Sequence, residues 1–373
     1  MNSKLRSKGD FCMKIKLIGE PKVIMSNPTS KHNFFAWPSV VRLQNGKIAV
    51  GASGYRLSHI CPFGKSVMAI SEDEGETYTS PMPIIDTPLD DRDVGLCTFG
   101  ESGLIFTSFN NAAEFQRNYA KSEKCPNYVD YRLNYIDTIT KEDENNYLGT
   151  TFRISQDCGT TFGKIYHSSV TSPHGPMELS DGTVLWIATT WPGENGLEAH
   201  IIHTKDGTME KIGEIEPIYK DGEKLCSCEP HAIELPDGRI LCHIRVQQFT
   251  SERKYMTLYQ IESADKGKTW SKPIQIIGDL DGAPAHLYLH SSGVLFSAYG
   301  RRIEPYGIRL MFSKDYGKTW DTNHVLFENP MKRDGGYPAT IELADGSLLT
   351  VFYTYPENES VAAICQQKWR IDE

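Results

Sequence analysis

The sequence predicts an all-β fold, a six-bladed β-propeller whose blades are four-stranded antiparallel sheets. The first observation is a repeated phrase, in which a proline, a short apolar run, a turn with Gly and a second apolar run follow one another. Four copies begin 54 residues apart, and a fifth and a looser sixth copy precede them: Pro176, Pro230, Pro284, Pro338, Pro38 and Val94. A long period with hairpin chemistry is typical of propellers, so six copies predict six blades.

The second observation is another repeated phrase, Ser-x-Asp-x-Gly-x-Thr followed by an aromatic residue. Its four good copies begin at Ser71, Ser155, Ser263 and Ser313. The phrase is typical of a tight turn, because Asp bonds nearby backbone, Gly takes the left-handed conformation and the aromatic ring anchors the next strand. We therefore expect these aspartates to be structural.

Within each unit the first strand begins at the proline, the second follows the Gly turn, the third leads into the Ser-x-Asp turn and the fourth follows it. The last unit has only three such strands before the sequence ends. We expect residues 14–25 to supply its outer strand, because a borrowed strand closes the ring without an exposed edge. Residues 1–13 would then be a tail, and residues 14–373 a single propeller domain.

Blade two contains an insertion, residues 110–146, between its second and third strands. An ordered insertion of this size is more often functional than ornamental. It is expected to cover the pocket or to mediate oligomerisation.

Composition excludes several classes of function. The net charge of −9 leaves no basic cluster to neutralise phosphates, which argues against a nucleic-acid partner. Nine cysteines without framework spacing indicate reduced thiols, and Cys226 and Cys228 near His231 are expected to be thiols beside a strand rather than metal ligands. We expect no metal and no cofactor. With no apolar signal segment and no run of some 18 apolar residues, we expect a cytoplasmic protein that does not enter a membrane.

Topology decides which residues share a face. In an up-and-down blade the start of strand one, the end of strand two and the start of strand three meet on the face opposite the Asp turns. That face should collect one residue before each proline, the strand ends and nearby loop residues: Trp37, Gly175, Glu229, Ala283, Tyr337, Arg56, Asn110, Trp191, Arg245, Arg301, Arg302, Arg309, His59, Asp90, Asp91, Asp93, His174 and His231. Acids, a phenol and several arginines at the mouth of one ring indicate a functional cleft.

Over nearly its whole length the sequence resembles the sialidase superfamily, six-bladed propellers with Asp boxes. The resemblance implies that Glu229, before Pro230, is a general base and that Arg245, at the end of the next strand, binds substrate. It also implies that Tyr337, before Pro338, is the nucleophile that attacks the anomeric carbon. A neutral phenol suits this reaction, since a carboxylate nucleophile would repel an acidic substrate.

Two departures from the family leave questions open. Ala36 stands where sialidases have the first of three arginines, and the loop 54–65 lacks the family's acid/base aspartate. For the proton donor we favour His59, with Asp91 or Asp93 next, because a histidine near its usual pKa can donate at neutral pH.

The sequence therefore predicts a sialidase-like exo-glycoside hydrolase acting on a terminal acidic sugar, either sialic acid or a uronic acid. Arginines would bind the acidic group and aromatic rings would stack on the sugar, with two histidines nearby: Arg56, Arg245, Arg301, Arg302, Arg309, Trp37, Trp191, His174 and His231. Two alternatives stay open. One is a glycosidase or lyase acting on an acidic polysaccharide, with His59 or His231 as base and Tyr337 as acid; the other is a non-catalytic carbohydrate-binding propeller.

Overall fold

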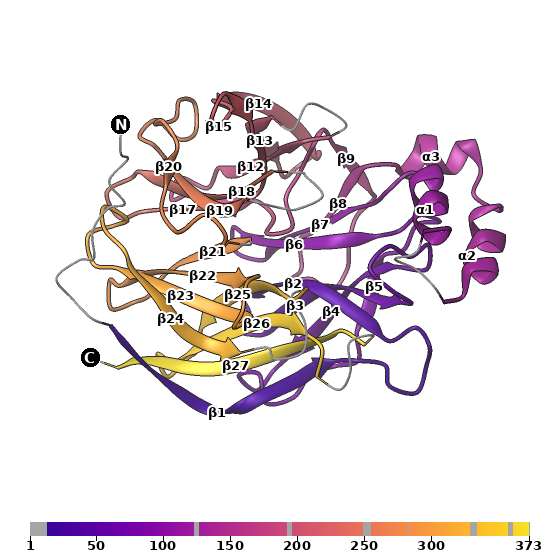
Figure 1. Cartoon of the computed structure of the whole chain (residues 1–373), viewed down its shortest axis with the longest axis horizontal. Helices are drawn as coiled ribbons and strands as arrows, with labels where there is room; N and C mark the ends of the chain where they lie inside the picture. The colour runs from indigo at the N-terminus through magenta and orange to yellow at the C-terminus, as the bar shows by residue number, and fades with distance from the viewer. Residues whose placement is uncertain are drawn as a thin grey trace.

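The structure is a computed structural model that describes residues 13–122, 127–191, 196–248, 255–282, 284–328, 334–356 and 361–372. The expected tail lies almost wholly outside these residues, as does Ala283. Six small antiparallel sheets follow one another along the chain, one for each blade of a six-bladed propeller (Figure 1). This confirms the predicted fold class.

The first three blades run from the N-terminal side. Blade one has β2 (Phe34–Arg42), β3 (Ile48–Arg56), β4 (Lys65–Ser71) and β5 (Met82–Ile85). Blade two has β6 (Arg92–Phe99), β7 (Gly103–Phe109), β8 (Thr150–Ser155) and β9 (Tyr166–Ser168). Blade three has β10 (Val170–Thr171), β11 (Met177–Glu178), β12 (Val184–Thr190), β13 (Leu197–His203) and β14 (Thr208–Ile215).

The remaining blades complete the ring. A short ribbon, β15 (Tyr219–Lys220) and β16 (Glu223–Lys224), precedes blade four. Blade four has β17 (Cys226–Glu234), β18 (Ile240–Gln247), β19 (Met256–Ser263) and β20 (Ile274–Gln275). Blade five has β21 (Ala285–Leu289), β22 (Leu295–Arg301), β23 (Gly307–Ser313) and β24 (Asp321–Glu328). Blade six has β25 (Gly336–Glu342), β26 (Leu348–Thr354), β27 (Ala363–Asp372) and β1 (Lys14–Met25).

Closure of the ring depends on the first strand. Strand β1 pairs with β27 in antiparallel register, from Lys14 opposite Asp372 to Met25 opposite Ile364 (Figure 1). The predicted outer strand of blade six is therefore confirmed, with the same bounds. Strand β1 covers the edge of β27 and gives blade six its fourth strand.

Blade three departs from the predicted pattern, because its first strand is split into β10 and β11. Pro173 and Pro176 lie in the interval, and a proline has no N–H to donate to a sheet ladder. Both pieces pair with β12, so the blade keeps its place in the ring.

The core lies between neighbouring blades. Blades one and six share an apolar cluster in which Val50, Val351 and Phe35 are wholly buried. The Ser-x-Asp turns join the third and fourth strands of blades one, two, four and five. In the first of them the Asp73 carboxylate accepts hydrogen bonds from the Thr77 N–H, at 2.8 Å, and from its hydroxyl, at 2.5 Å. These bonds lower the pKa of Asp73 to about 2, which suits a permanently charged turn residue rather than a proton donor.

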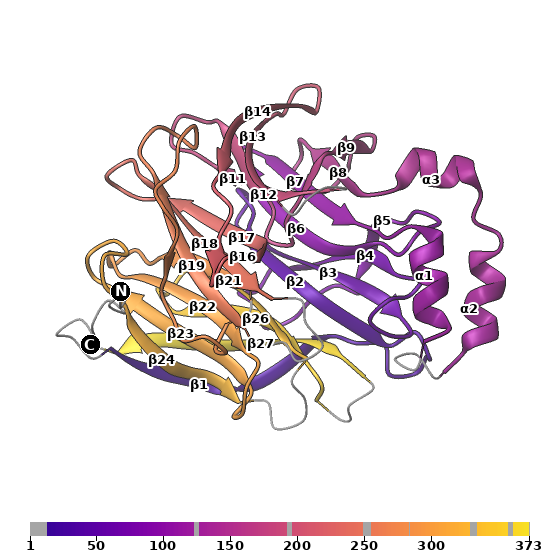
Figure 2. The ribbon, with the colours of Figure 1, turned by 45° about the horizontal axis from the view of Figure 1, so that its top comes forward.

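Three helices fill the insertion between β7 and β8: α1 (Ala113–Ala120), α2 (Val129–Ile136) and α3 (Lys141–Tyr147). They stand at one end of the molecule beside blades one and two (Figure 2). The Tyr131 ring of α2 stacks on Phe63, with ring centroids 4.7 Å apart. Buried Arg132 of α2 donates from Nη2 to the Ser58 hydroxyl over 2.9 Å. The insertion therefore braces the loop that follows β3.

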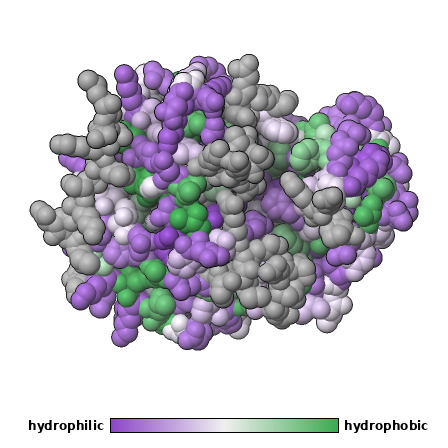
Figure 3. Space-filling model, in the orientation of Figure 1, coloured by the Kyte–Doolittle hydropathy of each residue, from purple (hydrophilic) through white to green (hydrophobic). Residues whose placement is uncertain are grey.

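The face of the molecule in Figure 3 is mostly hydrophilic, with small separated apolar patches. In the part of the chain that the structure describes, no helix is both long enough and apolar enough to cross a membrane.

Candidate active site

One backbone feature recurs at the inner strand of the blades. Trp37, Asp93, Glu229 and Tyr337 all have left-handed φ angles, between 51° and 57°. Each of these four residues lies within a register shift of the first strand of its blade. A left-handed backbone is unfavourable for a residue with a side chain. Such residues also recur in the Ser-x-Asp turns, at Glu74, Cys158, Lys266 and Tyr316, so the backbone alone does not identify a site and the side chains must do so.

Blade three has a glycine at this position. Gly175, with φ 76°, lies directly against strand β6, where a Cβ would come within 2.9 Å of the Leu96 nitrogen. The equivalent position of blade five, Ala283, is outside the described residues.

The two residues expected to react lie in contact. The Tyr337 hydroxyl donates a hydrogen bond to Glu229 Oε1 over 2.5 Å. Arg245 Nη1 donates to Glu229 Oε2 at 2.5 Å and to the Tyr337 oxygen at 3.3 Å. Its other terminal nitrogen donates to Gln247 at 2.7 Å. The predicted phenol, carboxylate and guanidinium therefore form one cluster, built from blades six and four.

The environment sets the charge of each member. Burial and the nearby Glu229 carboxylate raise the pKa of Tyr337 well above its ordinary value, so the phenol is neutral. Burial alone would raise the pKa of Glu229, but the Arg245 charge and the Tyr337 hydroxyl outweigh it, and the net shift is downward. The carboxylate is therefore ionised and ready to accept a proton.

Arg302 lies next to this cluster. Its guanidinium is 5.9 Å from the centre of the Tyr337 ring and only 8% of its side chain is exposed. Its nearest acidic partner, Asp334, is 3.7 Å away, beyond hydrogen-bond distance, and Arg302 Nε has no partner among the described residues. A buried guanidinium without a close partner is suited to binding an anion.

His59 shares with Arg302 the neighbour Asp334. Its Nδ1 lies 3.7 Å from Asp334, and 40% of its side chain is exposed. Burial of the ring lowers the pKa of His59, and the contact with Asp334 offsets only part of that effect. The imidazole is therefore neutral near pH 7, which weakens it as an acid.

Asp93, on blade two, lies near enough to Glu229 and His59 for their charges to act on its pKa. Arg92 Nε approaches Asp93 Oδ1 at 3.3 Å, and 19% of the Asp93 side chain is exposed. Burial raises the pKa of Asp93, although the positive charge of Arg92 opposes the shift. A carboxyl group with a raised pKa keeps its proton at a higher pH than usual, as a general acid must.

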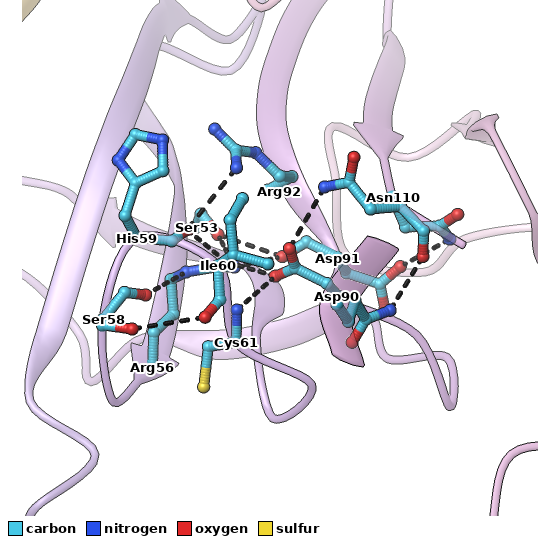
Figure 4. A network of polar contacts seen from close by, with 12 residues as sticks. Ser53, Arg56, Ser58, His59, Ile60, Cys61, Asp90, Asp91, Arg92 and Asn110 are labelled. Atoms are coloured by element: carbon cyan, nitrogen blue, oxygen red, sulfur yellow. Dashed lines mark hydrogen bonds and ion pairs between the residues drawn. The ribbon is translucent and has the colours of Figure 1, made fainter. Parts of the chain in front are cut away.

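Asp91 and Arg56 lie in one buried network (Figure 4). Burial raises the pKa of Asp91 to about 7, and its hydrogen bonds from Thr87 and Asn110 oppose only part of that shift. Asp91 is wholly buried and accepts from the Thr87 hydroxyl at 3.0 Å and from Asn110 at 3.3 Å. Arg56 is wholly buried, pairs with Asp90 and donates to the Asp91 carbonyl at 2.9 Å and to the Ser53 hydroxyl at 2.8 Å. Neither side chain has surface left for a substrate, whereas the His59 ring points away from this network (Figure 4).

Arg309 and Arg301 are held within blade five. Arg309 is 1% exposed and donates to the carbonyl oxygens of Phe327, at 3.2 Å, and Pro305, at 3.0 Å. Arg301 donates to Asn323 over 3.1 Å and lies 3.4 Å from Asp281. The predicted role in substrate binding is wrong for Arg309, because its hydrogen bonds join the outer strands of the blade.

The two tryptophans differ. Trp37 is 1% exposed, and Arg92 covers its ring at 4.0 Å from the ring centre, so it has no face for a sugar and the stacking prediction is wrong. Trp191 remains 37% exposed and packs edge-on against Phe109, with centroids 5.0 Å apart. Stacking of a sugar on Trp191 stays a prediction.

The two predicted histidines join a third inside the ring of blades. The rings of His231 and His286 stack with centroids 4.1 Å apart, and His174 lies 5.3 Å from His231. Burial lowers the pKa of His174 to about 4. Cys226 and Cys228, in β17, are free thiols. Among the described residues, no three or more His, Cys, Asp or Glu side chains are placed to hold a metal ion.

A known protein family matches the sequence. Residues 136–350, more than half of the sequence, match the BNR repeat-like domain. The chain belongs to this family. No relative with a curated description matches the sequence.

Several solved structures are similar in fold to this BNR repeat-like protein. A protein of unknown function from Dyadobacter fermentans is 18% identical with a TM-score of 0.73, and the match covers 96% of this chain and 99% of that one. The intramolecular trans-sialidase of Ruminococcus gnavus is 12% identical with a TM-score of 0.63, covering 94% and 96%. A Trypanosoma rangeli sialidase in complex with 2,3-difluorosialic acid, titled a covalent intermediate, is 13% identical with a TM-score of 0.61, covering 90% of this chain and 54% of that one. At these identities the matches show the fold, and they confirm the resemblance to sialidases at that level.

The sequence analysis did not single out one charged residue of the candidate site of this BNR repeat-like protein. Arg92, the first residue of β6, lies between the Trp37 ring and Asp93. Its neighbours in the sequence, Asp90, Asp91 and Asp93, drew attention to the segment as a source of acids. The signal in the sequence that would have found Arg92 is its place two residues before Val94, which opens the repeated phrase of blade two.

Proposed function

We propose that this protein is an exo-acting glycoside hydrolase that removes a terminal acidic sugar, with Tyr337 as nucleophile and Glu229 as its base. The observation that carries the proposal is the hydrogen bond between the Tyr337 hydroxyl and the ionised Glu229, with Arg245 in contact with both. A phenol paired with a buried carboxylate has the geometry of a nucleophile and its general base.

The proton stays on Tyr337 until substrate is bound. The raised pKa of Tyr337 and the lowered pKa of Glu229 make a free phenolate unfavourable. Proton transfer to Glu229 therefore accompanies attack of the phenolic oxygen on the anomeric carbon, when negative charge leaves that oxygen. Arg245 stabilises the phenolic oxygen while it carries partial charge.

The leaving oxygen needs a proton, and we assign its donation to Asp93. Burial raises the pKa of Asp93, so it keeps its proton at a higher pH than an exposed carboxyl group does, whereas burial lowers the pKa of His59. This assignment revises the preference for His59 that the sequence suggested. Asp93 then removes a proton from the water that attacks the anomeric carbon, the bond from that carbon to the Tyr337 oxygen breaks, and the proton on Glu229 returns to Tyr337, as microscopic reversibility requires.

An acidic substituent on the substrate is favoured by Arg302. Its guanidinium forms no hydrogen bond with another described residue, and it lies beside the ring of the proposed nucleophile. A carboxylate bound there gains charge-assisted hydrogen bonds that a neutral sugar lacks. The T. rangeli sialidase complex, titled a covalent intermediate with 2,3-difluorosialic acid, supports a fluorinated acidic sugar as a trapping reagent.

The test is a panel of aryl glycosides of sialic, glucuronic and galacturonic acid, with aryl glucoside and galactoside as neutral members. We expect turnover of at least one acidic member, and loss of that activity by a factor of at least about 1,000 in Tyr337→Phe. Tyr78→Phe is the matched control, because the Tyr78 hydroxyl bonds Gln366 beside an Asp turn. Full activity in Tyr337→Phe would remove the nucleophile assignment. An unsaturated sugar product would favour a lyase, and binding without turnover would favour a carbohydrate-binding propeller.

A further inference from the structure

We infer that Arg92 is a further substrate-binding arginine, which holds the acidic group of the sugar. The inference rests on the proposed function and deepens it. Arg92 corresponds to no residue that the resemblance to sialidases carries over, because the arginine expected on blade one is Ala36 here.

Three neighbours fix the position of Arg92: an aromatic ring, a carbonyl oxygen and a carboxylate. Its guanidinium lies 4.0 Å from the centre of the buried Trp37 ring, a cation–π arrangement that holds the group in one plane. Its Nη1 reaches the His59 carbonyl oxygen at 3.5 Å, and its Nε reaches Asp93 at 3.3 Å. The side chain therefore lies between the proposed proton donor and the loop of His59.

The hydrogen bonds of Arg92 are few and long. A guanidinium has five N–H donors, and Arg92 uses two of them, both at distances above 3.2 Å. Its Nη2 forms no hydrogen bond with another described residue. These remaining donors are available to a planar oxyanion, which a guanidinium binds in a bidentate manner.

Arg56 provides the contrast within the same neighbourhood. It also lies near the Trp37 ring, at 5.2 Å, yet it pairs with Asp90 and fills its other donors with backbone and hydroxyl oxygens. Arg56 therefore serves the fold, and Arg92 is the guanidinium of this pair that is left for a ligand.

Arg92 also connects acid recognition to the chemistry. A carboxylate on Arg92 competes with Asp93 for that positive charge and adds a negative charge beside it. Since the Arg92 charge opposes the upward shift in the pKa of Asp93, a bound acidic sugar should raise that pKa further. An acidic substrate then helps to keep the proton donor protonated, and a neutral sugar does not.

The experiment compares Arg92→Gln and Arg92→Lys with the wild-type protein on matched substrates. One pair is the 4-nitrophenyl glucuronide and glucoside, which differ in the carboxylate alone; the other is an aryl sialoside and its methyl ester. We expect Arg92→Gln to raise KM for the acidic member about 10- to 100-fold and for the neutral member less than about threefold. Arg92→Lys, which keeps the charge but loses the fork, should be intermediate.

Two controls separate binding from folding. Arg153→Gln removes an arginine of the same blade that donates to the carbonyl oxygens of Gly163, Ile84 and Phe162, and it should not change the acidic preference. Thermal unfolding identifies any variant that is not folded. An intermediate KM of Arg92→Lys for the acidic substrate is a second measurement of the role of Arg92 in binding. In addition, Tyr337→Phe should bind free glucuronic or N-acetylneuraminic acid in calorimetry, and adding Arg92→Gln should weaken that binding about 10- to 100-fold.

Turnover of acidic glycosides with an unchanged KM in a folded Arg92→Gln protein would overturn the role of Arg92 and leave the proposed function intact. If the wild-type protein neither cleaves nor binds any acidic sugar, the proposed function fails, and the role of Arg92 fails with it.

Discussion

The hydroxyl of Tyr337 on blade six donates a 2.5 Å hydrogen bond to the carboxylate of Glu229 on blade four. The two residues are 108 positions apart in the sequence and lie on the first strands of blades six and four, β25 and β17. The proposed chemistry at this pair therefore depends on the arrangement of the blades.

Glu229→Gln tests the base. Glutamine keeps a side-chain oxygen near Tyr337 but cannot take its proton at neutral pH, so kcat should fall by about 100- to 10,000-fold. The variant also removes the negative charge that Arg245 now balances, so KM for an acidic glycoside should not rise. Steady-state kinetics measure both quantities. A large increase in KM with little change in kcat would mean that Glu229 positions substrate rather than accepting a proton.

Asp93→Asn tests the proton donor. A donor must be protonated, so kcat/KM of the wild-type protein should fall as the pH rises through the pKa of Asp93, which burial has raised above its ordinary value. Asparagine should abolish that limb of the pH profile. It should also slow alkyl glycosides, which have poor leaving groups, more than 4-nitrophenyl glycosides. The same pattern in His59→Ala, with normal behaviour in Asp93→Asn, would assign the role to His59 instead.

The buried histidines predict acid sensitivity. Burial lowers the pKa of His174 to about 4, while an unfolded histidine titrates near its ordinary value. Below the ordinary value the unfolded chain binds more protons, so the free energy of unfolding should fall as the pH decreases toward 4, by roughly 2 kcal/mol between pH 7 and pH 5 from this residue alone. Urea unfolding of wild-type protein and His174→Gln at both pH values measures the effect. Parallel losses in the two proteins would show that His174 is not responsible.

The buried ion pair of Arg56 with Asp90 predicts a large effect of removing one partner. Both side chains are wholly buried, so Arg56→Met leaves an uncompensated carboxylate and should lower the free energy of unfolding by about 3–5 kcal/mol. Glu72→Gln, which breaks the exposed pair with Lys47, should cost less than about 1 kcal/mol. Chemical denaturation compares them. Equal costs would mean that the buried pair is solvated in solution.

The repeats made the architecture accessible from sequence. Each blade carries its own turn chemistry, and the absence of one strand at the end of the sequence pointed to residues 14–25. Tyr337 and Glu229 were predictable because each precedes a proline that marks a blade. The split of the first strand of blade three into β10 and β11 was not predicted. The repeat continues across Pro173 and Pro176, and the effect of their missing N–H groups on the strand was not considered.

Side-chain direction was the harder problem. A strand alternates its side chains, but a bulge adds one residue and reverses the pattern beyond it. Arg56 and Arg92 both belong on the functional face by topology, yet Arg56 turns inward to Asp90 while Arg92 reaches Trp37 and Asp93. Residue type alone does not show which residue of a first strand adopts the left-handed conformation, or which way the side chains next to it point.

The left-handed backbone at Trp37, Asp93, Glu229 and Tyr337 has a consequence for stability. Each of these residues costs the folded state on the order of 1 kcal/mol, which glycine at the same place would not. Glycine in place of Glu229 or Tyr337 should therefore relax the backbone while removing the side chain that the proposed reaction requires.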